Sequence, residues 1–318
     1  MTIAAFRDFK QKRFLLFVIF FRVSLAISNG RYEKGLMDKK IAEFANTHKT
    51  AHQAGLKGLF RFLSFSLEED AVSRHKKTLS EGWLYHTTRE RLNDPHDLNF
   101  RLDWPSLDDE DGIEGFVEDL KIGIAMSGIK EFPIRLAIGD LLKDEQYRNR
   151  FESQLRAQYE KTRVCCFTTS HLNPLFWAHY AKSGTGYCMR FKVGEGNKSI
   201  FSNTRKILYS DNYPVLKFPI ISTNIISTMR PILSKSSEWI YENEFRSFFS
   251  PDWPHQLENN GDSLSLINDE ITDIYFGLNM GEAEKAKIIE LTEDGPFNPC
   301  FWNAVTDRHS FKLKFERY

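Results

Sequence analysis

Residues 166–191 read CFTTSHLNPLFWAHYAKSGTGYCMRF and predict a strand, a helix and a second strand in immediate succession. Asn173 is a favoured N-cap residue, and Pro174 follows at the first helical position, where the missing N–H of proline costs no hydrogen bond. We expect this helix to run to about Lys182 and to end at Gly184, because glycine readily adopts the left-handed conformation that closes a helix.

Strands and helices are predicted along the rest of the chain, but they do not alternate strictly. Runs of strand length and character occur at 58–64, 83–88, 163–168, 186–192, 205–210, 244–249, 271–277 and 310–317. Helices are expected at 37–56, 67–80, 113–160 (in at least two pieces, broken near Pro133), 222–230 (ending before Pro231) and 282–292. The sequence has neither a G-x-G-x-x-G motif nor a P-loop, which argues against Rossmann and P-loop domains.

These patterns predict an α+β fold, with a mostly antiparallel central sheet flanked by helices and a helical insert around 113–160. Residues 1–56 are expected to form an N-terminal extension that is apolar at 14–27 and then continues as a polar helix. Residues 57–318 are expected to form a single α+β domain.

The composition is that of an ordinary globular protein, with 41% hydrophobic and 27% charged residues among 318. Lys and Arg together number 43, and so do Asp and Glu, so the chain lacks the overall basic excess typical of nucleic-acid binders. The overall balance does not exclude a local basic groove. The four cysteines include an adjacent pair and no C-x-x-C, so neither a disulfide framework nor a zinc site is indicated. Cys165, Cys166 and Cys188 lie in strand-like runs and are expected to be small buried hydrophobes.

The amino-terminal segment carries an apolar run at 14–21 (FLLFVIFF) behind several basic residues. The run is too short for a comfortable transmembrane helix, so no stable membrane insertion is expected. It has some features of a signal peptide. We favour two other interpretations, a helix that docks on the core and an upstream extension with Met37 as the natural start.

The helix after Asn173 carries several large side chains on neighbouring turns. Phe176 is expected to face the core. Trp177, His179 and Tyr180 are either further core residues or part of a binding site, because buried Trp and Tyr need partners for their polar atoms.

A second candidate is residues 239–246, WIYENEFR. If this segment is extended, Glu242, Glu244 and Arg246 point to the same side. Two neighbouring carboxylates repel, so one of them should have a raised pKa unless Arg246 lies between them. Such a pair can accept a proton or stabilise a developing positive charge. The alternative is a solvated edge strand with an ordinary ion pair.

Three further polar motifs each have a structural and a functional interpretation. Arg61, within LFRF, either faces water or clamps a phosphate or carboxylate group. The hydroxyls from Thr168 to Ser170 either hold a turn or bind a ligand at the mouth of the following helix. Asn93 and Asp94 begin the run NDPHD, which predicts a turn and offers too few ligands to indicate a metal site.

Several of these motifs occur in one order that resembles the bacterial domain-of-unknown-function 2971 family over roughly residues 57–316. The motifs are LFRF (59–62), LNDPHD (92–97), CFTTSHLNPLFWAHYAKSGTGYCMRF (166–191), WIYENEFR (239–246) and ITDIYFG (271–277). The chain departs from the family pattern with His96 and Asp97, where an aromatic residue and an acid are expected, and with Phe176, where methionine is frequent. The resemblance implies a cytoplasmic protein and leaves its activity open.

A more distant resemblance is to Arg/Ser/Glu-type ADP-ribosyltransferases, in which an early arginine, a hydroxyl run and a late E-x-E follow one another. This resemblance implies that NAD is the cofactor and that Arg61 clamps its pyrophosphate. It further implies the roles of the remaining residues: Thr168 and Ser170 support the nicotinamide pocket, Glu244 bonds the ribose and stabilises the transition state, Glu242 orients the acceptor, and Trp177 or Tyr180 stacks on a ring.

Three classes of function follow from these observations. The first is an NAD-consuming ADP-ribosyltransferase or glycohydrolase in bacterial defence or a toxin-like role, with a small nucleotide as its partner. The second is a non-catalytic ligand-sensing or interaction module in phage or stress response. The third is a metal-dependent phosphodiester enzyme, for which the candidate residues are Asp94, Asp97, His179, Glu242 and Glu244.

Overall fold

The computed structural model describes residues 42–106, 108–110, 113–114, 117, 142–194, 199–218, 225–251, 257–309 and 313–318. The chain divides into two compact units. Unit 1 comprises Met1–Thr47, Leu98–Tyr159 and Asn212–Ile232, and unit 2 comprises His48–Asp97, Glu160–Asp211 and Leu233–Tyr318. The apolar run at 14–21 and most of the predicted insert between 118 and 141 lie outside the described residues.

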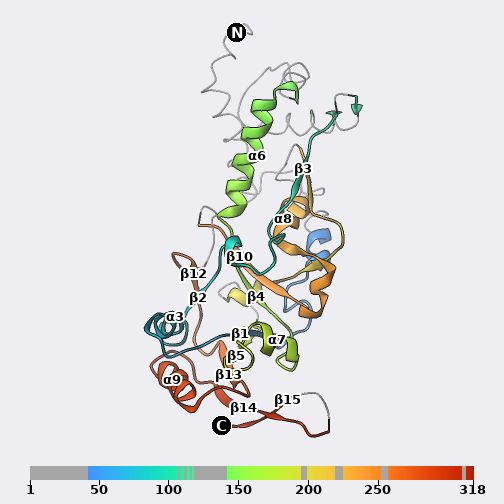
Figure 1. Cartoon of the computed structure of the whole chain (residues 1–318). Helices are drawn as coiled ribbons and strands as arrows, with labels where there is room; N and C mark the ends of the chain where they lie inside the picture. The colour runs from blue at the N-terminus through green and yellow to red at the C-terminus, as the bar shows by residue number, and fades with distance from the viewer. Residues whose placement is uncertain are drawn as a thin grey trace. The chain divides into compact units, whose positions relative to one another are not determined.

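The largest sheet of unit 2 has five strands (Figure 1). Their order is β1 (Gly58–Leu63), β5 (Tyr187–Lys192), β13 (Ile271–Phe276), β14 (Cys300–Thr306) and β15 (Leu313–Arg317). All neighbours are antiparallel except β13 and β14. The sheet therefore confirms the predicted α+β fold with mostly antiparallel strands, although β14 was not among the predicted strands.

The parallel pair β13–β14 requires a crossover, and helix α9 (Glu282–Glu293) supplies it. Helix α3 (Glu69–Leu79), which follows β1, contacts α9 (Figure 1). Apolar side chains from both helices and from one face of the sheet join the main core, among them Leu79, Ile288, Leu291, Leu59, Met189 and Phe276. The opposite face of the sheet carries a second, aromatic cluster with Phe60, Phe62, Phe176, Trp177 and Tyr275.

A three-stranded sheet positions the candidate site. Strand β10 (Phe245–Phe249) lies between β4 (Arg163–Phe167) and β6 (Arg205–Lys206), and both pairings are antiparallel. The expectation of a solvated edge strand is therefore wrong, because β10 is central. Side chains alternate across the strands: Phe245, Phe249, Cys165 and Phe167 belong to the main core, whereas Arg246 and its partner Cys166 point to the other face.

Short elements complete unit 2. Strand β2 (Trp83–Tyr85) pairs with β12 (Ser263–Ser265), which pairs with β11 (Asn259–Asn260), and β7 (Leu208–Tyr209) pairs in parallel with β9 (Ser234–Lys235). The remaining helical elements are η2 (Arg89–Arg91), α7 (Pro174–His179), η3 (Ile200–Ser202) and η4 (Ser237–Glu242).

Unit 1 contains the parallel pair β3 (Arg101–Asp103) and β8 (Val215–Lys217) and the long helix α6 (Glu145–Glu160). Helix α8 (Ile225–Leu233) also begins in this unit. Stacked rings fill part of its interior: Trp104 lies 4.2 Å from Phe218, and both contact Phe151. Helix α6 confirms the end of the predicted insert.

Two predicted helix ends are wrong. Helix α8 continues through Pro231 to Leu233, because a proline in the last turn removes only one backbone N–H. Helix α7 ends at His179 rather than near Lys182, since Lys182, Ser183 and Gly184 all have positive φ.

After α7, the chain passes very close to strand β1 at Gly186. A Cβ at Gly186 would lie 2.0 Å from the carbonyl oxygen of Leu63, so only glycine fits against β1 there.

Two predicted strands also differ from the structure. The predicted strand 205–210 is split at Ile207, and its halves, β6 and β7, join different sheets. The segment 239–246 is not extended throughout, because its first part is the 3-10 helix η4.

The four cysteines are free; Cys165 and Cys188 are buried as expected, whereas Cys166 is only half-buried. None of the helices within the described residues combines the length and apolar character that a membrane crossing needs.

Candidate functional site

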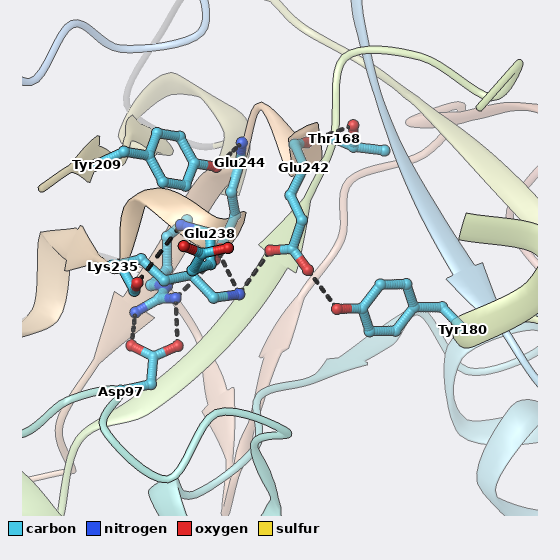
Figure 2. A network of polar contacts seen from close by, with 10 residues as sticks. Asp97, Thr168, Tyr180, Tyr209, Lys235, Glu238, Glu242 and Glu244 are labelled. Carbon is cyan, nitrogen blue, oxygen red and sulfur yellow. Dashed lines mark hydrogen bonds and ion pairs between the residues drawn. The ribbon is translucent and has the colours of Figure 1, made fainter. Parts of the chain in front are cut away.

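A buried chain of ion pairs runs through unit 2 (Figure 2). Its inner end is Arg246, which is completely buried and binds both carboxylate oxygens of Asp97 at 2.8 Å. The Arg246 Nε donates to Glu244 Oε1 at 2.8 Å. One guanidinium group therefore holds two carboxylates in fixed positions, as its planar set of donors allows.

The outer half of the chain continues from Glu244 through Lys235. The Lys235 Nζ lies 3.3 Å from Glu244 Oε2 and 2.5 Å from Glu242 Oε2. The other oxygen of Glu242, Oε1, accepts a short hydrogen bond from the hydroxyl of Tyr180, the residue that caps the C-terminus of α7. The chain thus joins the 94–97 turn, β10, β9, η4 and the end of α7.

The turn between η4 and β10 explains how Glu242 and Glu244 share this network. Asn243 adopts a left-handed conformation with φ 44°, which asparagine tolerates better than most residues. Its side chain donates to Thr169 Oγ1 at 2.7 Å, and Thr168 Oγ1 donates to the carbonyl of Glu242 at 2.8 Å. The two carboxylates meet as predicted, but a turn brings them together rather than an extended strand.

The two glutamates differ in their ionisation. Burial raises the pKa of Glu244, but Arg246 and Lys235 outweigh it and hold the pKa at about 2. Burial also raises the pKa of Glu242, and there the opposing effect of Lys235 is insufficient, since Glu244 repels the second charge. Glu242 is thus the carboxyl with the raised pKa that the sequence predicted, and Lys235 rather than Arg246 lies between the pair.

The outer end of the chain is bordered by half-buried aromatic side chains. Phe176 lies 5.4 Å from Tyr180 and 6.4 Å from Tyr241, and Tyr241 lies 6.2 Å from Trp239. The Lys235 ammonium lies 4.7 Å from the centre of the Trp239 ring. Glu242 itself is buried, with 4% of its surface exposed, next to this row of aromatic rings.

Arg61 does not belong to this network. Its Nη1 donates to the Tyr85 carbonyl at 3.0 Å and to the Cys165 sulfur at 2.8 Å. Cys165 lies on the core face of the β4–β10 sheet, whereas Glu244 binds Arg246 on the other face. Arg61 and Glu244 both act electrostatically on Cys165, and the common cleft expected of them stays a prediction.

The other predicted residues divide between core and surface. Trp177 is buried, donates to the His171 carbonyl at 2.8 Å and packs edge-on against Phe62. His179 is exposed on α7. Ser170 accepts from the Leu172 N–H, which is the turn-forming role.

The NDPHD segment forms the predicted turn. Asp94 is buried and accepts from the His96 N–H at 2.8 Å, while Asn93 is exposed. The side chain of Asp97, at the end of the turn, accepts a hydrogen bond from Arg246. Among the described residues, no group of three or more His, Cys, Asp or Glu side chains is arranged to hold a metal ion. Asp94, Asp97, His179, Glu242 and Glu244, the residues proposed for a metal-dependent phosphodiester enzyme, therefore do not form such a group.

The sequence did not reveal three members of the site. Lys235 lies in ILSKSSEW, where nothing distinguishes it from a surface lysine. Tyr209, whose hydroxyl accepts from the Glu244 N–H at 2.8 Å, is one of two residues in a very short strand. Cys166 contacts Glu244 and raises no expectation beyond burial.

Comparison with known proteins gives one match. Residues 176–247 match the model of a family described as Protein of unknown function (DUF2971). This segment contains Tyr180, Lys235, Glu242, Glu244 and Arg246. No curated protein and no solved structure matches the chain. The match supports the first family resemblance, and no comparison supports the resemblance to ADP-ribosyltransferases.

Proposed function

We propose that unit 2 is a ligand-sensing module whose recognition point is Glu242 together with Tyr180. The observation that carries the proposal is the hydrogen bond between the half-buried Tyr180 and Glu242, a carboxyl that shares the Lys235 ammonium with Glu244. Three carboxylates (Asp97, Glu242, Glu244) share two cations (Lys235, Arg246). Glu242 ends this chain beside Tyr180, whose ring packs against Phe176.

The energetics of the chain also favour a functional role. Removing charged groups from water costs several kcal/mol per ion, and replacing a buried ion-pair network by apolar residues is often neutral or stabilising. A network of five charged groups is therefore a weak means of stabilising a fold. Shifted pKa values with identified charge partners are typical of functional sites, and here the pKa of Glu242 is raised while that of Glu244 is lowered to about 2.

The contact between Tyr180 and Glu242 offers a route from binding to a structural response. Tyr180 caps α7, and Glu242 ends η4, so their hydrogen bond joins two elements that are 62 residues apart in sequence. A ligand that replaces the Tyr180 hydroxyl on Glu242 breaks this connection. The end of α7 can then move without disturbing Arg246, which stays fixed by Asp97.

The test is a binding screen by isothermal titration and two-dimensional NMR, with small amines, carboxylates and nucleotides that include NAD. Glu242→Gln removes the charge but keeps the shape, and Glu258→Gln removes an exposed carboxylate elsewhere in unit 2. We expect at least one ligand that binds the unmodified chain and Glu258→Gln equally and binds Glu242→Gln at least tenfold more weakly. If every ligand found binds all three proteins alike, Glu242 is not the recognition point.

An NAD-consuming enzyme is the second candidate, and one observation favours it. The hydroxyl run and the E-x-E segment touch each other, through Thr168 on the Glu242 carbonyl and Asn243 on Thr169. A carboxyl with a raised pKa also suits proton transfer. Arg61 is given no part in this version, because its hydrogen bonds go to the Tyr85 carbonyl and the Cys165 sulfur.

Incubation of the protein with NAD tests this candidate by measuring nicotinamide release. The enzyme reading expects release that is lost in Glu242→Gln and kept in Glu258→Gln. Release that survives Glu242→Gln, or no release at all, rejects it.

A further inference from the structure

We propose that the outer edge of strand β15 pairs with the same edge of a second copy of this chain. The paired strands are antiparallel, and Phe315 of each copy lies opposite Phe315 of the other, on a two-fold axis. This inference goes beyond the proposed function and does not depend on it. Three features of β15 carry it: its place in the sheet, the direction of its backbone hydrogen-bonding groups and the order of its charges.

Strand β15 is the last strand of the five-stranded sheet (Figure 1). Within the residues that the structure describes, β14 is the only strand that pairs with it. An edge strand of this kind presents backbone N–H and C=O groups with which another strand can pair. On the aromatic face of the sheet, the half-buried Leu313 and Phe315 carry the apolar surface up to this edge, so a neighbouring strand would also cover apolar side chains.

The backbone of β15 directs alternate residues toward β14 and toward the outer edge. The Tyr318 N–H donates to the Phe301 carbonyl at 2.9 Å, so these opposed residues form a hydrogen-bonded pair. Such pairs alternate along an antiparallel ladder, and the register of β14 and β15 continues from this one. The residues whose backbone groups point outward are therefore Leu313, Phe315 and Arg317.

These outward groups are complementary to those of a second copy. With Phe315 opposite its own counterpart, Leu313 lies opposite Arg317 of the second copy. All three residues then occupy hydrogen-bonded positions of the new ladder, so each outward N–H and C=O group gains a partner. The same two-fold axis brings the Phe315 rings of both copies onto one face of the joined sheet.

The charges of β15 select this register. Lys314 and Glu316 flank Phe315, so each Lys314 lies opposite Glu316 of the other copy, at the non-hydrogen-bonded positions where opposed side chains are closest. The neighbouring symmetric registers would place Lys314 against Lys314 or Glu316 against Glu316, and like charges directly opposite are destabilising.

Both charged residues are accessible to a second copy. Glu316 is exposed, and the side chain of Lys314 is 60% accessible although its ammonium binds Asp307 at 3.0 Å. An ammonium has three donors, so Lys314 can bind a second carboxylate. Charges on an edge strand commonly keep other strands away. Here their order around Phe315 makes them attract a second copy in one register and repel it in the others.

The experiment measures the oligomeric state of the full chain by analytical ultracentrifugation over a range of concentrations at low ionic strength. We expect an equilibrium between monomer and dimer. Lys314→Glu and Glu316→Lys each place like charges opposite one another across the axis, so each variant alone should dimerise at least about tenfold more weakly. Lys77→Glu makes the same change of charge on an exposed residue of α3 and should dimerise like the unmodified chain.

A mixture of the two β15 variants tests the register itself. When Lys314→Glu pairs with Glu316→Lys, positions 314 and 316 of opposite copies again carry opposite charges. Equal amounts of the two variants should therefore form a heterodimer whose affinity is within about threefold of that of the unmodified dimer.

Each other outcome overturns the proposal. A chain that stays monomeric at every concentration has no such interface, and a dimer that neither substitution weakens uses another surface. Variants that lose the dimer and do not regain it on mixing show that the register around Phe315 is wrong. Thermal unfolding of each variant establishes first that it is folded. Because Glu316→Lys leaves the pair of Lys314 and Asp307 intact, its effect on the dimer decides the matter even if Lys314→Glu is destabilised.

Discussion

The two faces of strand β10 bury polar groups in opposite ways. On the core face, Ser247 bonds the ring of His86, whose pKa burial lowers to about 3, so this pair is neutral. On the other face, Arg246 is equally buried but remains charged, because Asp97 and Glu244 more than offset its loss of water. Neighbouring residues of one strand thus show that burial alone does not decide ionisation; the available partners do.

Removal of Arg246 should have the largest effect on this difference. Arg246→Met leaves Asp97 and Glu244 buried without their cation, so we expect a loss of about 3–5 kcal/mol in the free energy of unfolding. Urea denaturation measures it. A combined Asp97→Leu, Glu244→Gln and Arg246→Met variant should regain most of the loss, and a single-variant loss within about 1 kcal/mol would show that the chain is not held as described.

The neutral face should respond to mild acid. The pKa of His86 falls from 6.5 in the unfolded chain to about 3 in the fold, so below pH 6.5 the unfolded state binds the extra proton. His86 therefore contributes stability above pH 6.5 that is lost as the pH falls toward about 3, with a slope of up to about 1.4 kcal/mol per pH unit.

Unfolding free energies measured between pH 7 and pH 4 in His86→Gln should show a smaller acid slope than in the unmodified chain. His75 and His171, whose pKa values burial also lowers, keep the remaining slope from vanishing. Identical slopes would contradict a neutral, buried His86.

The charged face should respond in a narrower and more acidic window. The pKa of Glu244 is lowered from 4.5 to about 2, so its contribution is complete above pH 4.5 and is lost as the pH falls toward about 2. Below pH 4.5, the unfolding free energy of Glu244→Gln should fall less steeply with decreasing pH than that of the unmodified chain. Above pH 4.5, the two plots of unfolding free energy against pH should be parallel. A difference confined to higher pH would show that Glu244 is not the strongly ionised member of the pair.

Tyr180→Phe should have the smallest effect. It removes one half-buried hydrogen bond to Glu242 and should cost about 1 kcal/mol of unfolding free energy. Because this bond lowers the pKa of Glu242, the variant should raise that pKa further, which carboxyl NMR can follow. An unchanged Glu242 titration would show that the hydroxyl does not act on this carboxyl.

Local chemistry was legible in the sequence wherever the partners are a few residues apart. Asn173 accepts from the Leu175 N–H at 3.0 Å, which is the cap that the Asn-Pro pair predicted. The alternation of LFRF and RVCCF gave the strands correctly. The end of α7 was missed, since three consecutive left-handed residues, two of them not glycine, have no strong sequence signal.

The candidate site was predicted in part. Glu242, Glu244 and Arg246 were selected for their spacing, and they do share a network. The spacing of these three residues says nothing about Arg61, whose position depends on how β1 lies beside β4. The sequence also could not show that β10 is a central strand, because that depends on the distant strands β4 and β6 pairing on either side of it.

The sequence by itself determined the capped helix at 173, the strand periods and the closeness of three charged residues in WIYENEFR, because capping and alternation act over a few residues. Only the tertiary structure decided which charges are buried and which partners they have. Asp97 binds Arg246 although the two are 149 residues apart in sequence. Lys235 joins the network because its strand β9 pairs with the short strand β7. The ionisation of Glu242 and Glu244 follows from these distant partners, so it arises only when the sheets assemble around β10.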